Sequence, residues 1–145
     1  MPVSPRLAFV QCLSPSGLHR MAYHEWGDAQ NPRVLVCVHG LSSPGRDFDV
    51  LAQALCNDYR VICPDVVGRG RSDWLADPKG YVLSQYASDM VTLLARLNAE
   101  SVDWFGTSMG GLIGIGLAGL PKSPIRKLLL NDVGPRVTES SLTRI

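Results

Sequence analysis

The sequence predicts an α/β fold, with a mostly parallel sheet that carries helices on both faces. Three observations support this prediction. Continuous apolar, β-branched runs at 33–38, 59–63 and 127–130 are typical of parallel strands buried on both sides. Apolar residues at helical spacing lie between these runs, and strand and helix patterns alternate to the end of the chain. At 145 residues, the chain has the length of one domain.

The chain opens with a predicted hairpin. Residues 7–13 and 18–26 have strand character, and the four residues between them, Ser14-Pro15-Ser16-Gly17, all favour a turn. Two amphipathic helices are expected further along, one between Phe48 and Leu55 and one over 81–97. The apolar face of the second comprises Leu83, Tyr86, Ala87, Met90, Leu93, Leu94 and Leu97. Both helices are expected to pack on the sheet.

Composition excludes several kinds of partner. There are 14 Lys and Arg against 13 Asp and Glu, and no basic run concentrates charge, so we expect no nucleic-acid partner. The cysteines at 12, 37, 56 and 63 match neither a zinc-site spacing nor a redox pair, which favours buried free thiols in a reducing cytoplasm. The start of the chain has no export signal, and its longest weakly polar stretch, Met109–Leu120, is 12 residues, too short to cross a membrane. We therefore expect a cytoplasmic protein without cofactor or metal.

The segment GTSMGG, from Gly106 to Gly111, fits the pattern G-x-S-x-G. In this pattern a sharp turn from strand to helix holds a serine hydroxyl clear of the sheet. A side chain two residues before or after Ser108 would collide with the turn, which explains Gly106 and Gly110. The free N–H groups of the following helix would face a developing oxyanion. On the motif alone, a glycine-rich turn that merely admits a closely packed helix is an equally good interpretation.

Four motifs in order resemble the serine hydrolase branch of the α/β-hydrolase superfamily. They are Val34 to Gly40 (within RVLVCVHG), PDVVGRGRS from Pro64 to Ser72, GTSMGG, and LLLNDVGP from Leu128 to Pro135. The resemblance covers essentially the whole chain but implies only the N-terminal portion of such a fold, truncated after about the sixth strand. The implied layout of one incomplete domain over 1–145 is an N-terminal hairpin at 7–26, a parallel α/β core at 33–135, and the start of a cap or linker at 136–145.

The resemblance also implies roles for individual residues. Ser108 would be the nucleophile, and the backbone amides of Leu41 and Met109 would form the oxyanion hole. His39, Gly40, Gly106 and Gly110 would support the loops, with His39 as a hydrogen-bonding residue and not the catalytic base. Asp65 would organise the turn that Gly68 and Gly70 allow. The expected reaction is hydrolysis of a small-molecule ester, thioester, lactone or carbon–carbon bond next to a carbonyl, through an acyl-enzyme. Ser108 argues against epoxide opening and halide displacement, which use an aspartate nucleophile in this superfamily.

Part of the expected catalytic set is missing. No histidine follows Ser108 in the chain, although the superfamily order is nucleophile, acid, histidine. Asp132 is a possible acid, and a cap for the turn before Gly134 and Pro135 is the alternative interpretation. A sheet that stops at the sixth strand also leaves an apolar edge, so we expect a C-terminal segment or a second chain to cover it. A non-catalytic binding or interaction fragment of the same fold therefore remains an alternative.

A competing motif points to a dinucleotide-binding oxidoreductase. Residues Gly114 to Gly119 spell G-x-G-x-x-G, the fingerprint of nicotinamide-cofactor folds. That fingerprint must lie on the turn directly after a strand, whereas Gly114 falls inside the helix that is expected to start near Ser108. Close packing of that helix against the sheet or another helix is the preferred explanation of these glycines.

Overall fold

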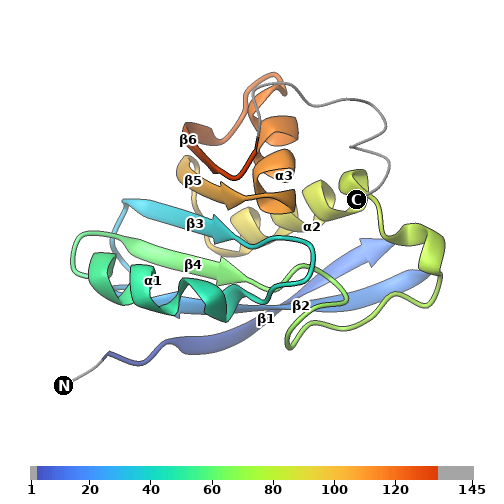
Figure 1. The fold of residues 1–145 in the computed structure, drawn as a ribbon, viewed down its shortest axis with the longest axis horizontal. Coiled ribbons are helices and arrows are strands. Elements are labelled where there is room, and N and C mark those ends of the chain that lie inside the picture. The colour runs from blue at the N-terminus through green and yellow to red at the C-terminus, as the bar shows by residue number, and fades with distance from the viewer. Residues whose placement is uncertain (1–2, 134–145) are drawn as a thin grey trace.

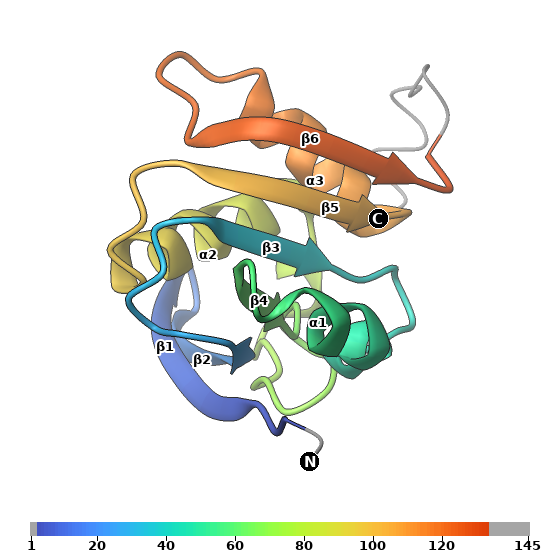
Figure 2. The same cartoon turned by 90° about the vertical axis from the view of Figure 1, so that its left-hand side faces the viewer.

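A six-stranded sheet with helices on both faces forms the molecule (Figure 1, Figure 2). The computed structural model describes residues 3–133. The strands are β1 (Arg6–Ser14), β2 (Gly17–Trp26), β3 (Val34–Val38), β4 (Arg60–Pro64), β5 (Val102–Thr107) and β6 (Ile125–Asn131). The helices are α1 (Asp49–Leu55), α2 (Leu83–Arg96) and α3 (Met109–Ala118), with short 3-10 turns η1 (Gly45–Phe48) and η2 (Pro78–Gly80).

The sheet is mostly parallel, as predicted. Its strand order is β1-β2-β4-β3-β5-β6, in which β2 runs antiparallel to β1 and β4 while β4, β3, β5 and β6 run parallel to one another. The hairpin of β1 and β2 therefore forms one side of the sheet and β6 the opposite edge. The carboxyl ends of the four parallel strands meet at one end of the sheet, where the loops that carry the sequence motifs lie.

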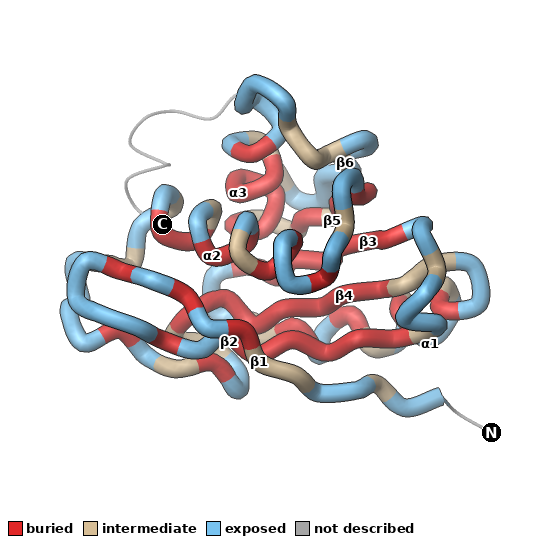
Figure 3. Tube along the Cα trace, turned by 180° about the vertical axis from the view of Figure 1, so that it is seen from behind, coloured by how far each residue is buried: buried red, intermediate tan, exposed pale blue. Residues whose placement is uncertain are grey.

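Two apolar cores, one on each face, explain the unbroken apolar runs. Alternate residues of β3 point to opposite sides: Val36 packs with Tyr86 and Trp104 beneath α2 and α3, whereas Leu35 and Cys37 pack beneath α1. All five residues of β3 are buried, and Figure 3 shows the buried central strands between exposed loops. A strand covered on both faces cannot show the alternating pattern of a half-exposed strand.

The four cysteines are free and buried, as the sequence predicts. Burial raises the pKa of Cys12 to about 12. Contact with the neighbouring thiol of Cys37, together with burial, raises the pKa of Cys63 well above its usual value. The thiols of Cys12 and Cys63 are therefore protonated, and all four cysteines act as small apolar side chains in the core.

The edge strand β6 is poorly covered, so the prediction that its apolar run is buried on both faces is wrong for residues 3–133. It pairs only with β5 among the described residues, and Leu129 and Leu130 are 50% and 41% exposed. The predicted cap or linker at 136–145, like Gly134 and Pro135, lies outside the described residues. Within residues 3–133, no helix combines the length and the apolar character needed to cross a membrane.

Candidate active site

Ser108 lies on a strained turn between β5 and α3. Its backbone has φ 52° and ψ −114°, a conformation that a non-glycine residue adopts only when its surroundings enforce it. Here the Ser108 N–H donates to the carbonyl of Asn131 at 3.0 Å, and the Ser108 carbonyl accepts from the N–H groups of Gly111 and Leu112 at 3.0 and 3.1 Å. The side chain is therefore held at the carboxyl edge of the sheet, partly accessible to solvent.

The glycines around Ser108 are required by close backbone approach, as predicted. A Cβ on Gly106 would lie 2.5 Å from the carbonyl carbon of Gly110, in the first turn of α3. A Cβ on Gly110 would lie 2.5 Å from the carbonyl carbon of Val38 and closer still to its oxygen. The buried indole of Trp104 donates to the Gly110 carbonyl at 3.0 Å and fixes the same turn from below. Only glycine lets α3 begin this close to β3 and β5.

The loop after β3 packs directly against Ser108. A Cβ on Gly40 would lie 3.4 Å from the Cβ and 4.0 Å from the Oγ of Ser108. His39, just before it, is 1% exposed and uses both ring nitrogens: Nδ1 donates to the Gly40 carbonyl at 2.6 Å, and Nε2 accepts from the Val66 N–H at 2.9 Å. Accepting at Nε2 requires the neutral ring, and burial lowers the His39 pKa in agreement. His39 therefore ties two loops together, the supporting role that the sequence predicts.

One predicted oxyanion donor, Met109, directly follows Ser108, and the other, Leu41, follows the glycine that packs against Ser108. Met109 is the first residue of α3, so its N–H has no partner within the helix. Leu41 follows Gly40, and its side chain is 47% exposed. Neither N–H donates a hydrogen bond to any group in residues 3–133. Both amides therefore have the free donor capacity that an oxyanion site needs.

Asp65 organises the loop after β4, as predicted, and reaches further than the sequence suggests. Its carboxylate accepts from the Arg71 N–H at 2.9 Å and from the Gly45 N–H at 2.7 Å. Gly68 and Gly70 have φ of 84° and 54°, and a Cβ on Gly70 would overlap the Asp65 carboxylate. One buried carboxylate thus fixes both the β4 loop and the start of η1.

Arg69, which motif reasoning alone does not single out, bridges this loop to the one beside Ser108. Its Nε donates to the Leu41 carbonyl at 3.0 Å, and its Nη1 donates to the Val67 carbonyl and the Tyr86 hydroxyl at 2.9 and 3.2 Å. The sequence offers one signal for this role: Arg69 is a charged residue at a turn position, and the turn itself does not require a charge there.

Asp132, the possible acid, is exposed and directly follows β6. Its predecessor Asn131 is paired with Thr107, so Asp132 reaches the same edge as Ser108 on the adjacent strand. Its carboxylate has no hydrogen-bond partner in residues 3–133. Because Gly134 and Pro135 are not among these residues, the alternative capping role is not described.

The histidines are not placed to serve as a base for Ser108. His39 has both ring nitrogens engaged. His19 and His24 lie on β2, which β4 and β3 separate from β5. With strands about 4.8 Å apart, their backbones lie roughly 14 Å from that of β5.

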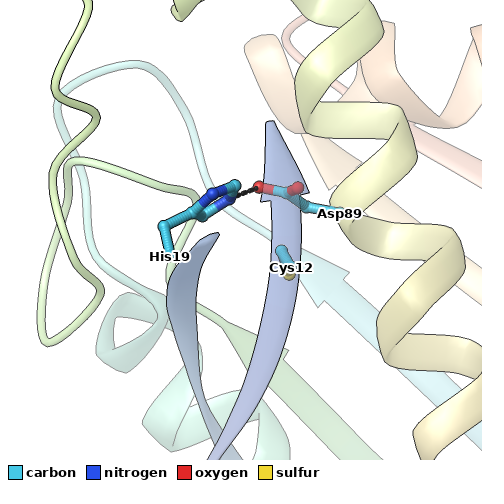
Figure 4. A group of neighbouring side chains, drawn as sticks. All are labelled: Cys12, His19 and Asp89. Atoms are coloured by element: carbon cyan, nitrogen blue, oxygen red, sulfur yellow. Dashed lines mark hydrogen bonds and ion pairs between the residues drawn. The ribbon is translucent and has the colours of Figure 1, made fainter. Parts of the chain in front are cut away.

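Three buried side chains far from Ser108 come close enough to share a cation. The ligand-type atoms of Cys12, His19 and Asp89 lie within 4.8 Å of one another, and Figure 4 shows them between the hairpin and α2. His19 Nε2 and Asp89 Oδ2 are already hydrogen-bonded at 2.7 Å, and Gln85 donates to the other oxygen at 2.8 Å. Burial raises the pKa of Asp89 as well as that of the Cys12 thiol, which disfavours the anionic ligands that a cation requires. The group is arranged as a hydrogen-bonded tie from hairpin to helix.

The dinucleotide fingerprint has the wrong placement, as predicted. Gly114 is buried within α3, where a Cβ would lie 2.6 Å from Nε1 of Trp104, so helix–sheet packing explains it. That explanation fails for the other two glycines: a Cβ on Gly116 would meet nothing within 4 Å, and one on Gly119 would make only ordinary contacts. The preference for close packing holds for one glycine of three.

Comparisons with known proteins agree with this fold. The family model described as alpha/beta hydrolase fold matches residues 33–142. The chain is 76% identical over all 145 residues to a 3-hydroxybutyrate-oligomer hydrolase of Cupriavidus necator and covers 50% of that protein. It is 32% identical over 107 residues to the Escherichia coli esterase YbfF, an alignment that covers 72% of this chain and 40% of that protein. An alpha/beta hydrolase from Novosphingobium aromaticivorans superposes with TM-score 0.81 and 39% identity, covering 97% of this chain and 48% of that one. The chain thus spans about half the length of the relatives it matches.

Proposed function

The chain belongs to the α/β-hydrolase fold family, and on that basis we propose that it carries the nucleophile half of a serine hydrolase that cleaves carboxylic esters. The observation that carries the proposal is the strained Ser108 turn at the carboxyl edge, near two amides, Leu41 and Met109, that donate no hydrogen bond within residues 3–133. A binding protein gains nothing from holding a serine in a left-handed conformation beside unused donors. Catalysis does gain from this arrangement, because the two amide donors then bind negative charge that develops on the substrate oxygen only in the transition state.

The proposed reaction has two steps. The Ser108 oxygen attacks the carbonyl carbon while a base takes its proton, and the Leu41 and Met109 amides bind the oxyanion. Collapse breaks the ester bond, and the alcohol leaves with the proton from the base. Water then attacks the acyl-enzyme and gives a proton to the base, and the base passes that proton to the Ser108 oxygen as the carboxylic acid leaves.

The base has to come from outside these 145 residues. The three histidines of the chain are engaged in other contacts or lie strands away from Ser108. We propose that a segment corresponding to the unmatched half of the relatives, or a second chain, supplies the histidine and also covers the edge of β6. Asp132, which has no hydrogen-bond partner within residues 3–133 and lies one strand from Ser108, is the proposed acid unless that segment brings its own.

The first substrate class to test is short oligomers of 3-hydroxybutyrate, because the relative with 76% identity over the whole chain is named for them. Hydrolysis would split one internal ester into a hydroxyl end and a carboxylate end. The four free buried thiols suit a reducing compartment, and we propose a cytoplasmic location on that ground.

The test is covalent labelling of the purified full-length protein with a fluorophosphonate, followed by intact-mass and peptide mass spectrometry. We expect one adduct, on Ser108, and none on Ser108→Ala, which should also lose ester hydrolysis. Ser42→Ala, in the exposed loop after β3, is the matched control and should label normally. A folded protein that takes no label, or that hydrolyses esters equally well as Ser108→Ala, would overturn the proposal and favour a non-catalytic binding role.

A further inference from the structure

The two peptide groups around Leu41 are each anchored through their carbonyl oxygen. The Gly40 carbonyl accepts from His39 Nδ1 at 2.6 Å and from the Ser43 N–H at 3.2 Å. The Leu41 carbonyl accepts from Arg69 Nε at 3.0 Å. In a trans peptide the N–H points opposite to the carbonyl, so holding the Gly40 oxygen against His39 directs the Leu41 N–H away from it. The His39 anchor therefore orients the peptide that carries the Leu41 N–H, and the Arg69 anchor holds the other side of the same residue.

Arg69 is itself held in place by the core. Its guanidinium lies over the rings of Tyr86 and Tyr81, at 5.3 and 6.0 Å from their centres, and Nη1 donates to the Val67 carbonyl and the Tyr86 hydroxyl. Tyr86 is fully buried on α2. The bond to Leu41 is thus the outer end of a rigid connection and not a contact made by a freely moving surface arginine.

The side chain of Leu41 adds little to this anchoring. It is 47% exposed, so the residue is positioned mainly through its backbone. Loss of the Arg69 contact would free the Leu41–Ser42 peptide and leave Leu41 anchored on one side only, through the Gly40–Leu41 peptide. That peptide carries the Leu41 N–H, which would then be held less firmly. Only a planar donor group that reaches three acceptors at once can hold both loops, which a lysine ammonium on a flexible stem cannot do.

We propose that Arg69 is a positioning residue for the oxyanion site, acting through the backbone of Leu41. This inference rests on the proposed serine hydrolase function for its kinetic consequence, but its structural part does not. A misplaced oxyanion donor weakens binding of the transition state more than that of the substrate.

The test compares Arg69→Met with Arg71→Met in the full-length protein. Arg71 lies in the same turn, and its exposed side chain makes no hydrogen bond or ion pair within residues 3–133. Arg71→Met therefore removes the same positive charge as Arg69→Met without removing a contact. With a 3-hydroxybutyrate oligomer as substrate, we expect Arg69→Met to lower kcat about tenfold at nearly unchanged KM, less than the 100-fold or greater loss typical of removing a donor outright. Affinity for a trifluoromethyl ketone, whose adduct carries an oxyanion, should fall by a similar factor. Arg71→Met should change neither quantity.

Hydrogen exchange of the 39–44 segment separates the two proposals. Arg69→Met should speed exchange of the Ser43 amide, which donates to the Gly40 carbonyl, while α2 and the melting temperature stay near those of the parent, whether or not the protein turns over esters. Unchanged exchange at 39–44, or equal kinetic losses in both variants, would overturn the role of Arg69. An inactive parent that takes no label at Ser108 would refute the proposed function alone.

Discussion

Gly110→Ala is the substitution for which the structure predicts the largest local conflict. The added Cβ would lie 2.5 Å from the Val38 carbonyl carbon, 2.9 Å from the His39 carbonyl oxygen, and closest of all to the Val38 oxygen. Ordinary contacts begin near 3.4 Å, so α3 would have to move about 1 Å away from β3. The neighbours are backbone atoms of a central strand and cannot rotate aside. We expect a loss of about 3 kcal/mol in unfolding free energy, at the upper end for overpacked sites.

Gly116→Ala is the matched control in the same helix. A Cβ there meets nothing within 4 Å, so the substitution keeps the helix-propensity gain of about 0.5–1 kcal/mol without a clash. Urea denaturation followed by tryptophan fluorescence measures both, since Trp26 and Trp104 are buried. The midpoint of Gly110→Ala should fall by about 1 M or more and that of Gly116→Ala should rise slightly. Equal midpoints for the two variants would refute the close approach of α3 to β3.

Three further predictions follow from buried polar groups and thiols. Asp65→Ala leaves the Gly45 and Arg71 amides without their acceptor and should lower the unfolding free energy by about 3 kcal/mol, measured by the same denaturation. Burial holds the pKa of His39 below its ordinary value of 6.5, so the stability that neutral His39 contributes is complete above about pH 6.5 and is lost as the pH falls through the folded-state pKa. Melting temperatures at pH 7.5, 6 and 5 should therefore decline in that order. A melting temperature that does not change with pH would contradict the hydrogen bond between His39 and Val66. The four cysteines should resist a thiol-reactive dye until urea unfolds the protein, and rapid labelling of any one in the native state would contradict its burial.

The local parts of this protein could be predicted from sequence because their causes are local. The apolar runs of β3 and β4 predict cover on both faces, and the spacing of apolar residues marks α2 as amphipathic. The glycines at 106 and 110 follow from the sterics of one turn around Ser108. For Gly106 the conflicting atoms are only a few residues away, so the sequence pattern contains the constraint, whereas the contact that requires Gly110 is with Val38 on a distant strand.

Contacts between distant segments could not be predicted in this way. Arg69 reaches the Leu41 carbonyl 28 residues away, and His19 meets Asp89 70 residues away, because strand order and register bring these segments together. Gly114 and Gly116 occupy equivalent positions in one sequence motif, yet Gly114 faces the Trp104 ring and Gly116 faces open space. The helix turns by about 100° per residue, so only one of its sides meets the sheet. The sequence by itself determined which residues form the strands, the helices and the Ser108 turn. The packing of those elements decided which loops meet at Ser108, and which side chains hold them there.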